Sequence, residues 1–186
     1  MRSVADALVS IEGAYNTVYW FDGADSTDNW KVNSPDVPGW VNDLSDLQFG
    51  EGYWIHLTRS ITLRLQGAGF LEQTRSPAQQ LPPATYYGPV LPYGNFEPKP
   101  GMEVFAWTSG VICGQGVTQL VDGQVVYSVN VSADGALTPG CGKDGSVVHF
   151  QVGDYKMVAA VSWSNERVQY VQLSTRAWMY IPMLFR

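Results

Sequence analysis

A short loop near the N-terminus gathers several side chains that could bind a cation. The stretch "DGADSTDN" offers Asp22, Asp25, Asp28 and Asn29, and calcium binds to oxygen-rich loops of this kind. The loop lacks the alternating ligands and the final glutamate of an EF-hand, and the same residue types build ordinary turns. We therefore expect no metal and no cofactor, with calcium at Asp22, Asp25 and Asp28 as the alternative.

The sequence patterns of hydrolytic enzymes are missing from this chain. It has no GxSxG nucleophile elbow, and its two histidines, His56 and His149, lie in alternating strand patterns where a histidine is more often packed or exposed than catalytic. Glycosidases need two carboxylates at a defined separation, and 17 acidic residues give too many pairs to choose from. We expect no enzyme; a glycosidase or a metal-dependent hydrolase ranks last.

Aromatic side chains offer a different chemistry, because their faces can stack on the apolar faces of sugars. Trp30 and Trp40 flank loops and are the candidates for a glycan-binding platform. Trp107 and Trp163 lie in apolar strand patterns and are expected inside the protein. The alternative for all of these rings is a place in the core or between domains.

The two cysteines, Cys113 and Cys141, both lie in glycine-rich contexts. They match neither a CxxC motif nor a zinc pattern with the histidines. We expect a disulfide between them, which indicates an oxidising compartment and hence an extracellular or cell-surface location. Two separate buried thiols are the alternative.

The composition argues against two further classes of partner, nucleic acid and a membrane that the chain would span. The 186 residues are 45% apolar but only 15% charged, with a net charge of −6 and no basic cluster. Nucleic acid is therefore not an expected partner. No apolar run is long enough for a membrane helix, and the N-terminus does not read as a secretory signal. If the protein is exported, the chain is mature or excised.

The first 66 residues are predicted to form a small α+β module. Spacing of Val4, Leu8 and Ile11 predicts one helix over 3–12, capped by Ser3. Strands are predicted at 16–22, 29–33, 53–58 and 61–66. Residues 67–84 contain three prolines and weak periodicity, which indicates a linker.

Residues 85–175 repeat short strand patterns separated by turns, without a helix pattern. This rhythm predicts an antiparallel β-sandwich, immunoglobulin-like or prealbumin-like. Asp122-Gly123 is a strong hairpin signal. Asn130-Val131-Ser132 forms a glycosylation sequon inside one strand pattern. The strands are predicted at 85–91, 102–108, 117–121, 124–131, 146–152, 156–163 and 167–174.

The chain ends in the apolar stretch "RAWMYIPMLFR", residues 176–186. Pro182 disfavours a central strand, but an edge strand, or a strand donated to the sheet of a neighbour, tolerates it. The stretch is thus a candidate assembly strand, packed in cis or in trans, or a short recognition tail. Its large apolar side chains are Trp178, Tyr180, Ile181, Leu184 and Phe185.

Three stretches resemble accessory modules of large secreted or cell-surface proteins of filamentous bacteria. The first combines a Trp-containing strand with "NDLSDL" and a closing "GEGYWI"; the second combines "ICGQG", "TPGCG" and a late "WSN"; the third is the terminal "YIPM". The resemblance covers nearly the whole chain. It implies a small module followed by a β-sandwich, and it transfers no catalytic residue.

Together these features predict a non-enzymatic extracellular structural or adhesive protein. It would be an assembling surface or filament subunit that uses its C-terminal apolar strand, with copies of itself or other surface proteins as partners. The alternative is a carbohydrate-binding module of a secreted protein, with a polysaccharide as ligand.

Overall fold

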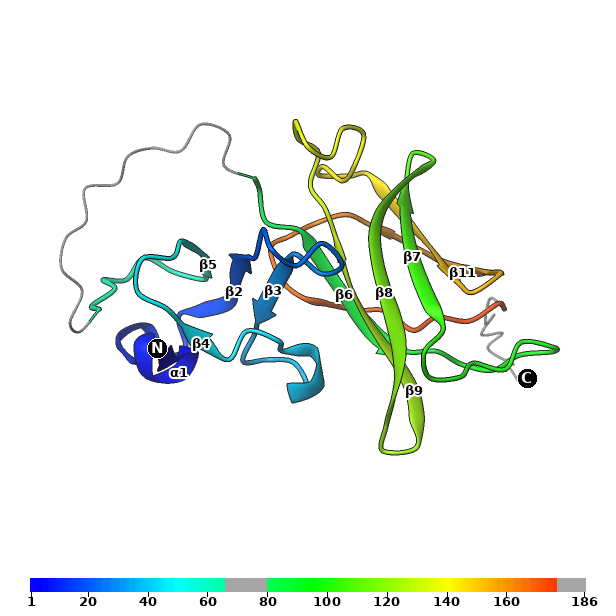
Figure 1. Cartoon of the computed structure of the whole chain (residues 1–186), viewed down its shortest axis with the longest axis horizontal. Helices are drawn as coiled ribbons and strands as arrows, with labels where there is room; N and C mark the ends of the chain where they lie inside the picture. The colour runs from blue at the N-terminus through cyan, green and yellow to red at the C-terminus, as the bar shows by residue number, and fades with distance from the viewer. Residues whose placement is uncertain (66–79, 177–186) are drawn as a thin grey trace, which may run out of the picture.

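The computed structural model describes residues 1–65 and 80–176, which form an N-terminal module and a larger C-terminal sheet beside it (Figure 1). These residues are mainly β with one α-helix, so the expected fold class is confirmed. Most of the predicted linker and the terminal 177–186 fall outside the described residues. Within the described residues, no helix is both long and apolar enough to cross a membrane.

The N-terminal module is built around a three-stranded antiparallel sheet in the order β3-β2-β5. A second, two-stranded sheet joins β1 to β4. The elements are β1 (Arg2–Ser3), α1 (Val4–Ala7), η1 (Val9–Ile11), β2 (Tyr15–Phe21), β3 (Trp30–Asn33), η2 (Gly39–Val41), β4 (Asp46–Leu47) and β5 (Tyr53–Leu57).

The helical segment begins as predicted but changes type along its length. The Ser3 side chain accepts a hydrogen bond from the Asp6 backbone N–H at 3.1 Å, which caps α1. The α-helix covers only Val4–Ala7 and is followed by the 3-10 turn η1. Leu8 and Ile11 are fully buried and pack with Val4 against Val18, so the predicted apolar face is the face that packs.

The C-terminal module is one curled sheet of seven strands in the order β11-β10-β7-β8-β9-β6-β12. Neighbouring strands are antiparallel except β12, which runs parallel to β6. The strands are β6 (Ala84–Pro89), β7 (Glu103–Thr108), β8 (Val111–Val121), β9 (Gln124–Val131), β10 (Val147–Val152), β11 (Tyr155–Ser162) and β12 (Gln169–Tyr170).

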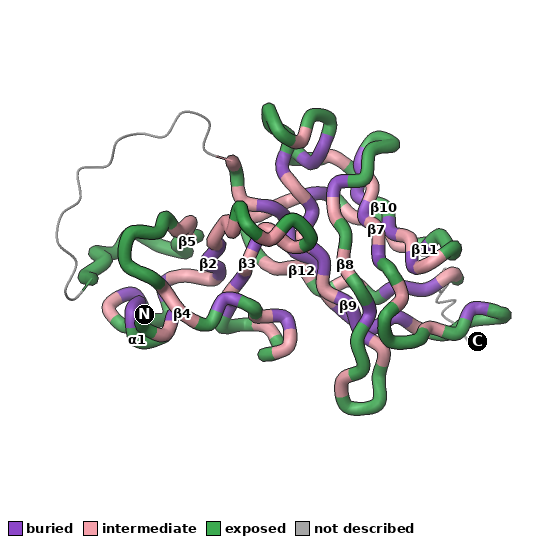
Figure 2. The backbone as a smooth tube through the Cα atoms, viewed as in Figure 1, coloured by how far each residue is buried: buried purple, intermediate pink, exposed green. Residues whose placement is uncertain are grey.

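The curl brings distant strands of this sheet into contact around one core. Phe150 of β10 contacts Tyr86 of β6 and Tyr127 of β9, with ring centroids 5.5 and 6.0 Å apart. The chain after β12 reaches the opposite edge of the sheet, where the Val158 N–H of β11 donates to the Ser174 carbonyl at 2.9 Å. The inward faces are therefore buried together, as in a sandwich (Figure 2).

Close backbone contacts shape β8, which starts six residues before the predicted strand at 117–121. A side chain on Gly116 would place its Cβ 2.6 Å from the Ser128 carbonyl oxygen of β9. Only glycine tolerates such an approach. The glycines of "CGQG" thus let β8 pack closely over β9, which is why a strand forms in a stretch with little strand propensity.

The expected disulfide between Cys113 and Cys141 is confirmed. It ties the start of β8 to the loop before β10 and closes a sequence separation of 28 residues. The next residue, Gly142, lies against the Trp163 indole, and any Cβ there would overlap the ring. The Trp163 Nε1–H donates to the Val131 carbonyl at 3.0 Å, so the cysteines, Gly142 and Trp163 form one packed unit.

Two predictions are wrong, one for the segment 61–65 and one for Trp107. Residues 61–65 form no strand, because they pair with no strand in the described part of the chain; the Arg64 backbone instead bonds the Ser10 hydroxyl, through its N–H at 2.9 Å and its carbonyl at 3.3 Å. Trp107 is only half-buried: Val104, Ala106 and Thr108 take the inward positions of β7, which places Trp107 on the outer face opposite His149.

A hydrogen-bonded chain centred on Asn130 joins the two modules, in addition to the bond from Asn16 Nδ2 to the Glu166 carbonyl at 2.8 Å. The Thr85 hydroxyl donates to Asn130 Oδ1 at 2.6 Å, so the Tyr19 hydroxyl must donate to Thr85 across their 3.0 Å contact. Asn130 Nδ2 in turn donates to Asp28 Oδ1 at 3.1 Å and to the Trp30 carbonyl at 2.8 Å. Tyr19, Asp28 and Trp30 belong to the N-terminal module, so Asn130 acts as the docking residue.

Replacing Asn130 should loosen this docking. Asn130→Ala removes three hydrogen bonds and leaves the Thr85 hydroxyl and the Trp30 carbonyl without their partner. We expect the free energy of unfolding to fall by about 2–3 kcal/mol, because buried polar groups that lose their partners are costly. Urea unfolding measures the change. Asn95→Ala, at an exposed loop position, is the control, and equal stability of the two variants would contradict the docking role.

Candidate functional site

A cleft of about 500 Å³ lies between the two modules. Both modules line it with polar side chains, and Trp40 contributes an aromatic ring. A smaller hollow of about 210 Å³ shares five of its lining residues and extends it toward Cys113. We call the larger space the intermodule cleft; its polar side chains include Asp28, Asp43, Gln115, Gln119, Ser128 and Asn130.

The C-terminal wall of the intermodule cleft is the outer face of β8 and β9. Residues alternate between the two faces of a strand, so the apolar Tyr127, Val129 and Val131 of β9 are buried while Ser128 and Asn130 are only partly buried. Gly116 lies in this wall beside Gln115 and Val117.

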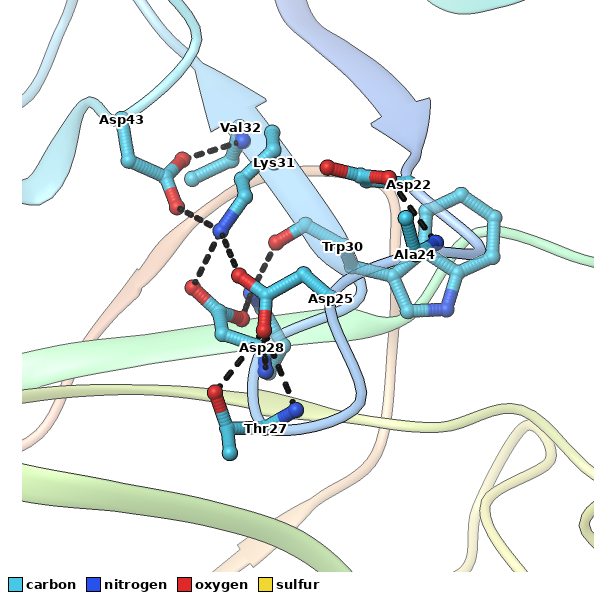
Figure 3. A network of polar contacts seen from close by, with 10 residues as sticks. Asp22, Ala24, Asp25, Thr27, Asp28, Trp30, Lys31, Val32 and Asp43 are labelled. Atoms are coloured by element: carbon cyan, nitrogen blue, oxygen red, sulfur yellow. Dashed lines mark hydrogen bonds and ion pairs between the residues drawn. The ribbon is translucent and has the colours of Figure 1, made fainter.

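The N-terminal wall includes part of the 22–29 loop, which the sequence offered as an alternative calcium site (Figure 3). Asp25 Oδ1 accepts hydrogen bonds from the Thr27 N–H, the Thr27 hydroxyl and the Asp28 N–H at 2.8–3.1 Å. Its other oxygen accepts from Lys31 Nζ at 2.9 Å. The Lys31 ammonium, followed by the Thr27 and Asp28 donors, holds the pKa of Asp25 well below its usual range.

Lys31 lies where three carboxylates converge. Its Nζ is 2.9 Å from Asp25, 3.3 Å from Asp28 and 3.9 Å from Asp43. Burial alone would lower the pKa of Lys31, but the three carboxylates outweigh it, and the net shift is upward. The lysine therefore stays charged and balances part of the negative charge of the wall.

The calcium alternative is not supported by this geometry. Asp22 turns away to accept the Ala24 N–H at 3.0 Å, while Asp25 and Asp28 converge on Lys31 instead of on an open point. In the described part of the chain, no group of three or more Asp, Glu, His or Cys residues is arranged to hold a metal ion.

Asp43 is the carboxylate of the site whose pKa is raised toward neutral pH. Burial raises the pKa of Asp43 to about 7; the Val32 N–H, which donates to it at 2.6 Å, opposes the rise, and the nearby Asp28 carboxylate adds to it. Lys31 lowers the pKa only weakly, since its nitrogen is 3.9 Å away. Asp28 and Asp43 thus form a like-charged pair that shares one lysine.

An aromatic strip runs out of the intermodule cleft across both modules. The Trp40 ring contacts the Tyr87 ring of β6 edge-on, with centroids 5.9 Å apart, and Tyr87 contacts Tyr170 of β12 in the same way at 5.6 Å. Tyr170 is 63% exposed. The strip is therefore open to solvent at its outer end.

Of the two predicted platform residues, the structure places only Trp40 at this site. Trp30 is 1% exposed and packs against Tyr19, Phe21 and Trp54. It cannot offer a ring face to a ligand, so this half of the prediction is wrong. The reason is the position of β3 at the sheet edge that docks on the C-terminal module, which covers Trp30.

The two histidines lie away from the intermodule cleft. His56 is exposed and pairs with Asn16 Oδ1 at 2.9 Å, and His149 is exposed on β10. The candidate assembly residues Trp178, Tyr180, Ile181, Leu184 and Phe185 lie outside the described residues.

The sequence did not identify four polar residues of the intermodule cleft: Asp43, Gln115, Gln119 and Asn130. Asp43 is 12 residues from Lys31 in the chain, and the two glutamines come from the other module, so no local spacing links them. A weak signal existed for Asn130, because Ser128, Asn130 and Ser132 alternate with apolar residues and mark a polar strand face.

Comparisons with known proteins identify no relative of this chain. No protein-family model matches it, and neither the curated proteins nor the solved structures give a significant match. The resemblance drawn from its motifs stays a prediction.

The pKa of Asp43 predicts a pH dependence of stability. Because folding raises this pKa from its ordinary value near 4 to about 7, the folded state disfavours the charged form. Stability from this group is present at low pH and is lost as pH rises through that window. Asp43→Asn should therefore gain stability relative to wild type between about pH 4 and pH 7, as measured by urea unfolding.

The control is Asp36→Asn, an exposed carboxylate away from Lys31. Its stability difference from wild type should stay flat over the same range. A carbon NMR titration of the Asp43 carboxyl gives the direct readout, and a midpoint in the ordinary aspartate range would refute the assignment.

Proposed function

We propose that this chain is a non-enzymatic extracellular adhesive protein that binds a polysaccharide in the intermodule cleft. The observation that carries the proposal is the combination of Trp40, at the cleft wall, with a strip of aromatic rings that leads outward from it. The proposal joins the adhesive role and the carbohydrate-binding role that the sequence suggested separately.

The chemistry of the lining suits a sugar chain. Amide and carboxylate side chains such as Gln115, Gln119 and Asp43 offer planar pairs of polar atoms, which can bond neighbouring hydroxyls of one ring. Aromatic faces cover the apolar C–H face of the same ring. Binding sites for small ligands typically combine concave shape, aromatic walls and a few placed polar groups.

The position of the aromatic strip favours a chain over a single sugar. Trp40, Tyr87 and Tyr170 come from η2, β6 and β12, and successive rings are 5.9 and 5.6 Å apart, which is the scale of one sugar unit. A ligand that fills the intermodule cleft would continue over Tyr87 toward the exposed Tyr170.

A hydrolytic role fits the carboxylates less well. Glycosidases keep their two acids apart with room between them for the sugar bond and a nucleophile. Here Asp28 already bonds both Lys31 and Asn130, at 3.3 and 3.1 Å, and Asp43 faces the same lysine. These contacts serve the loop and the docking of the modules.

The disulfide supports the extracellular part of the proposal, since disulfides persist in oxidising compartments. Both sulfurs belong to residues that are nearly fully buried. Cys113 also lines the smaller hollow beside the intermodule cleft, so the bond stabilises the region that would hold the ligand.

Binding should depend on Trp40. Trp40→Ala should weaken the affinity for a recognised polysaccharide by about tenfold or more, because an aromatic contact and its buried area are lost. Trp40→Phe should retain part of the affinity. Affinity electrophoresis against a polysaccharide panel, followed by calorimetry on oligosaccharides, measures the change.

The control is Phe49→Ala, since Phe49 is an exposed ring that does not line the intermodule cleft. Binding that survives in Trp40→Ala, or no binding to any polysaccharide, would refute the proposal. Release of reducing ends by wild-type protein would refute its non-enzymatic part.

Self-assembly through the C-terminal stretch is a second candidate, favoured by one observation. The last described residues run to the β11 edge of the sheet, where Ser174 accepts from Val158, and Arg176 lies 5.0 Å over the Tyr93 ring. A strand that follows would start beside β11, in its own sheet or in that of a neighbour.

Deletion of residues 177–186 tests this second function. If the stretch is donated in trans, the truncated chain should be monomeric where the full chain forms oligomers, as measured by size-exclusion chromatography with light scattering. The shortened chain must also keep its β-sheet circular dichroism spectrum. Oligomers of unchanged size would exclude donation by this stretch.

A further inference from the structure

We infer that the intermodule cleft prefers polysaccharides with free amino groups to neutral ones and rejects those with carboxylates. This inference concerns the ligand class and rests on the proposed glycan-binding function. Three features of the site support it: the negative charge of its lining, the pairing of Lys31 with three carboxylates, and the acceptor oxygens of Asp43.

All ionisable side chains that line the intermodule cleft are acidic. They are Asp28 and Asp43, and among the residues that the structure describes no Lys, Arg or His belongs to the lining of the cleft or of the smaller hollow beside it. The remaining polar groups are neutral amides and hydroxyls. A negatively charged sugar would therefore enter against like charges without a cation at the wall to receive it.

Lys31 does not change the sign of this field. Its ammonium has three N–H donors, and it lies within 4 Å of three carboxylates. With one positive charge against three negative ones, the group carries a net charge of −2 when all members are ionised. Release of Lys31 to a ligand would break its contact with Asp25 at 2.9 Å, which holds the loop together.

Asp43 has acceptor capacity beyond its contact with the Val32 N–H and its interaction with the Asp28 carboxyl. Its Oδ1 accepts from the Val32 N–H at 2.6 Å, whereas its Oδ2 is 3.9 Å from Lys31 Nζ, which is longer than a hydrogen bond. Its side chain is 37% exposed. Since each carboxylate oxygen can accept two hydrogen bonds, Asp43 can receive a donor from the ligand.

A sugar ammonium matches this arrangement better than a hydroxyl does. It offers three donors and a positive charge, and charge-assisted hydrogen bonds are roughly twice as strong as neutral ones. Binding would also relieve the repulsion between Asp28 and Asp43. The negative field in turn favours the protonated form of the amine.

Three β-1,4-linked hexasaccharides of equal backbone separate charge from shape: one of glucose, one of glucosamine and one of N-acetylglucosamine. A fourth, of glucuronic acid, tests rejection. At neutral pH and low salt we expect the glucosamine chain to bind about tenfold tighter than the glucose and N-acetylglucosamine chains, with a preference that shrinks as salt screens it. The glucuronic acid chain should show no binding by calorimetry.

The variant Asp43→Asn tests the role of the carboxylate. The ratio of glucosamine to glucose affinity should fall to near one, while Asp36→Asn should keep the wild-type ratio. Circular dichroism and urea unfolding verify that each variant is folded. If Asp43→Asn does not fold, Asp28→Asn provides the same ratio test from the other member of the pair.

The outcomes separate this inference from the function on which it rests. If the protein binds none of the four chains and no other polysaccharide, the glycan-binding function itself is refuted. Binding to the neutral chains with equal or weaker affinity for glucosamine, or an unchanged ratio in the variants, would refute the amine preference alone. Tight binding of the glucuronic acid chain would also overturn it.

Discussion

The structure depends on the docking of its two modules, in which the amide side chain of Asn130 makes three hydrogen bonds and that of Asn16 makes one, to the Glu166 carbonyl at 2.8 Å. Asn130 projects from β9 and uses its oxygen and both of its N–H groups, through Thr85 on one side and through Asp28 and Trp30 on the other. Burial raises the pKa of Tyr19, so its hydroxyl stays a donor at the far end of this chain of bonds. The docking also buries Trp30 and places Trp40 beside Tyr87. Without it there would be no cleft, because each module supplies one of the two walls.

Charge at the site follows from this docking. Asp28 serves both the intermodule bond to Asn130 and the contact with Lys31, which holds it close to Asp43. Two like charges near one another are unfavourable. They lie beside an aromatic ring and several amides, which together form the lining of the proposed glycan site.

The glycine and cysteine motifs have a structural explanation. "CGQG" permits the close approach of β8 to β9, and "PGCG" supplies the disulfide partner and the glycine on which Trp163 packs. Asn165, two residues later, donates to the Pro82 carbonyl at 3.0 Å and ties the start of β6 to the same region. These residues fix backbone positions around the cleft wall, which accounts for their spacing without a catalytic role.

Local patterns in the chain predicted the mainly β fold, the capped helix start, the Asp122-Gly123 hairpin and the disulfide, because each depends on periodicity, turn chemistry or residue type within a short window. They failed for residues 61–65, where the alternation was clean but the described part of the chain offers no partner strand. They also could not separate Trp30 from Trp40, which look alike beside their loops. Three features depend on which surfaces face each other after folding: the burial of Trp30, the outward position of Trp107, and the place of Asp43 and Gln115 in one cleft. Such contacts join residues far apart in the chain, and only packing in three dimensions sets them.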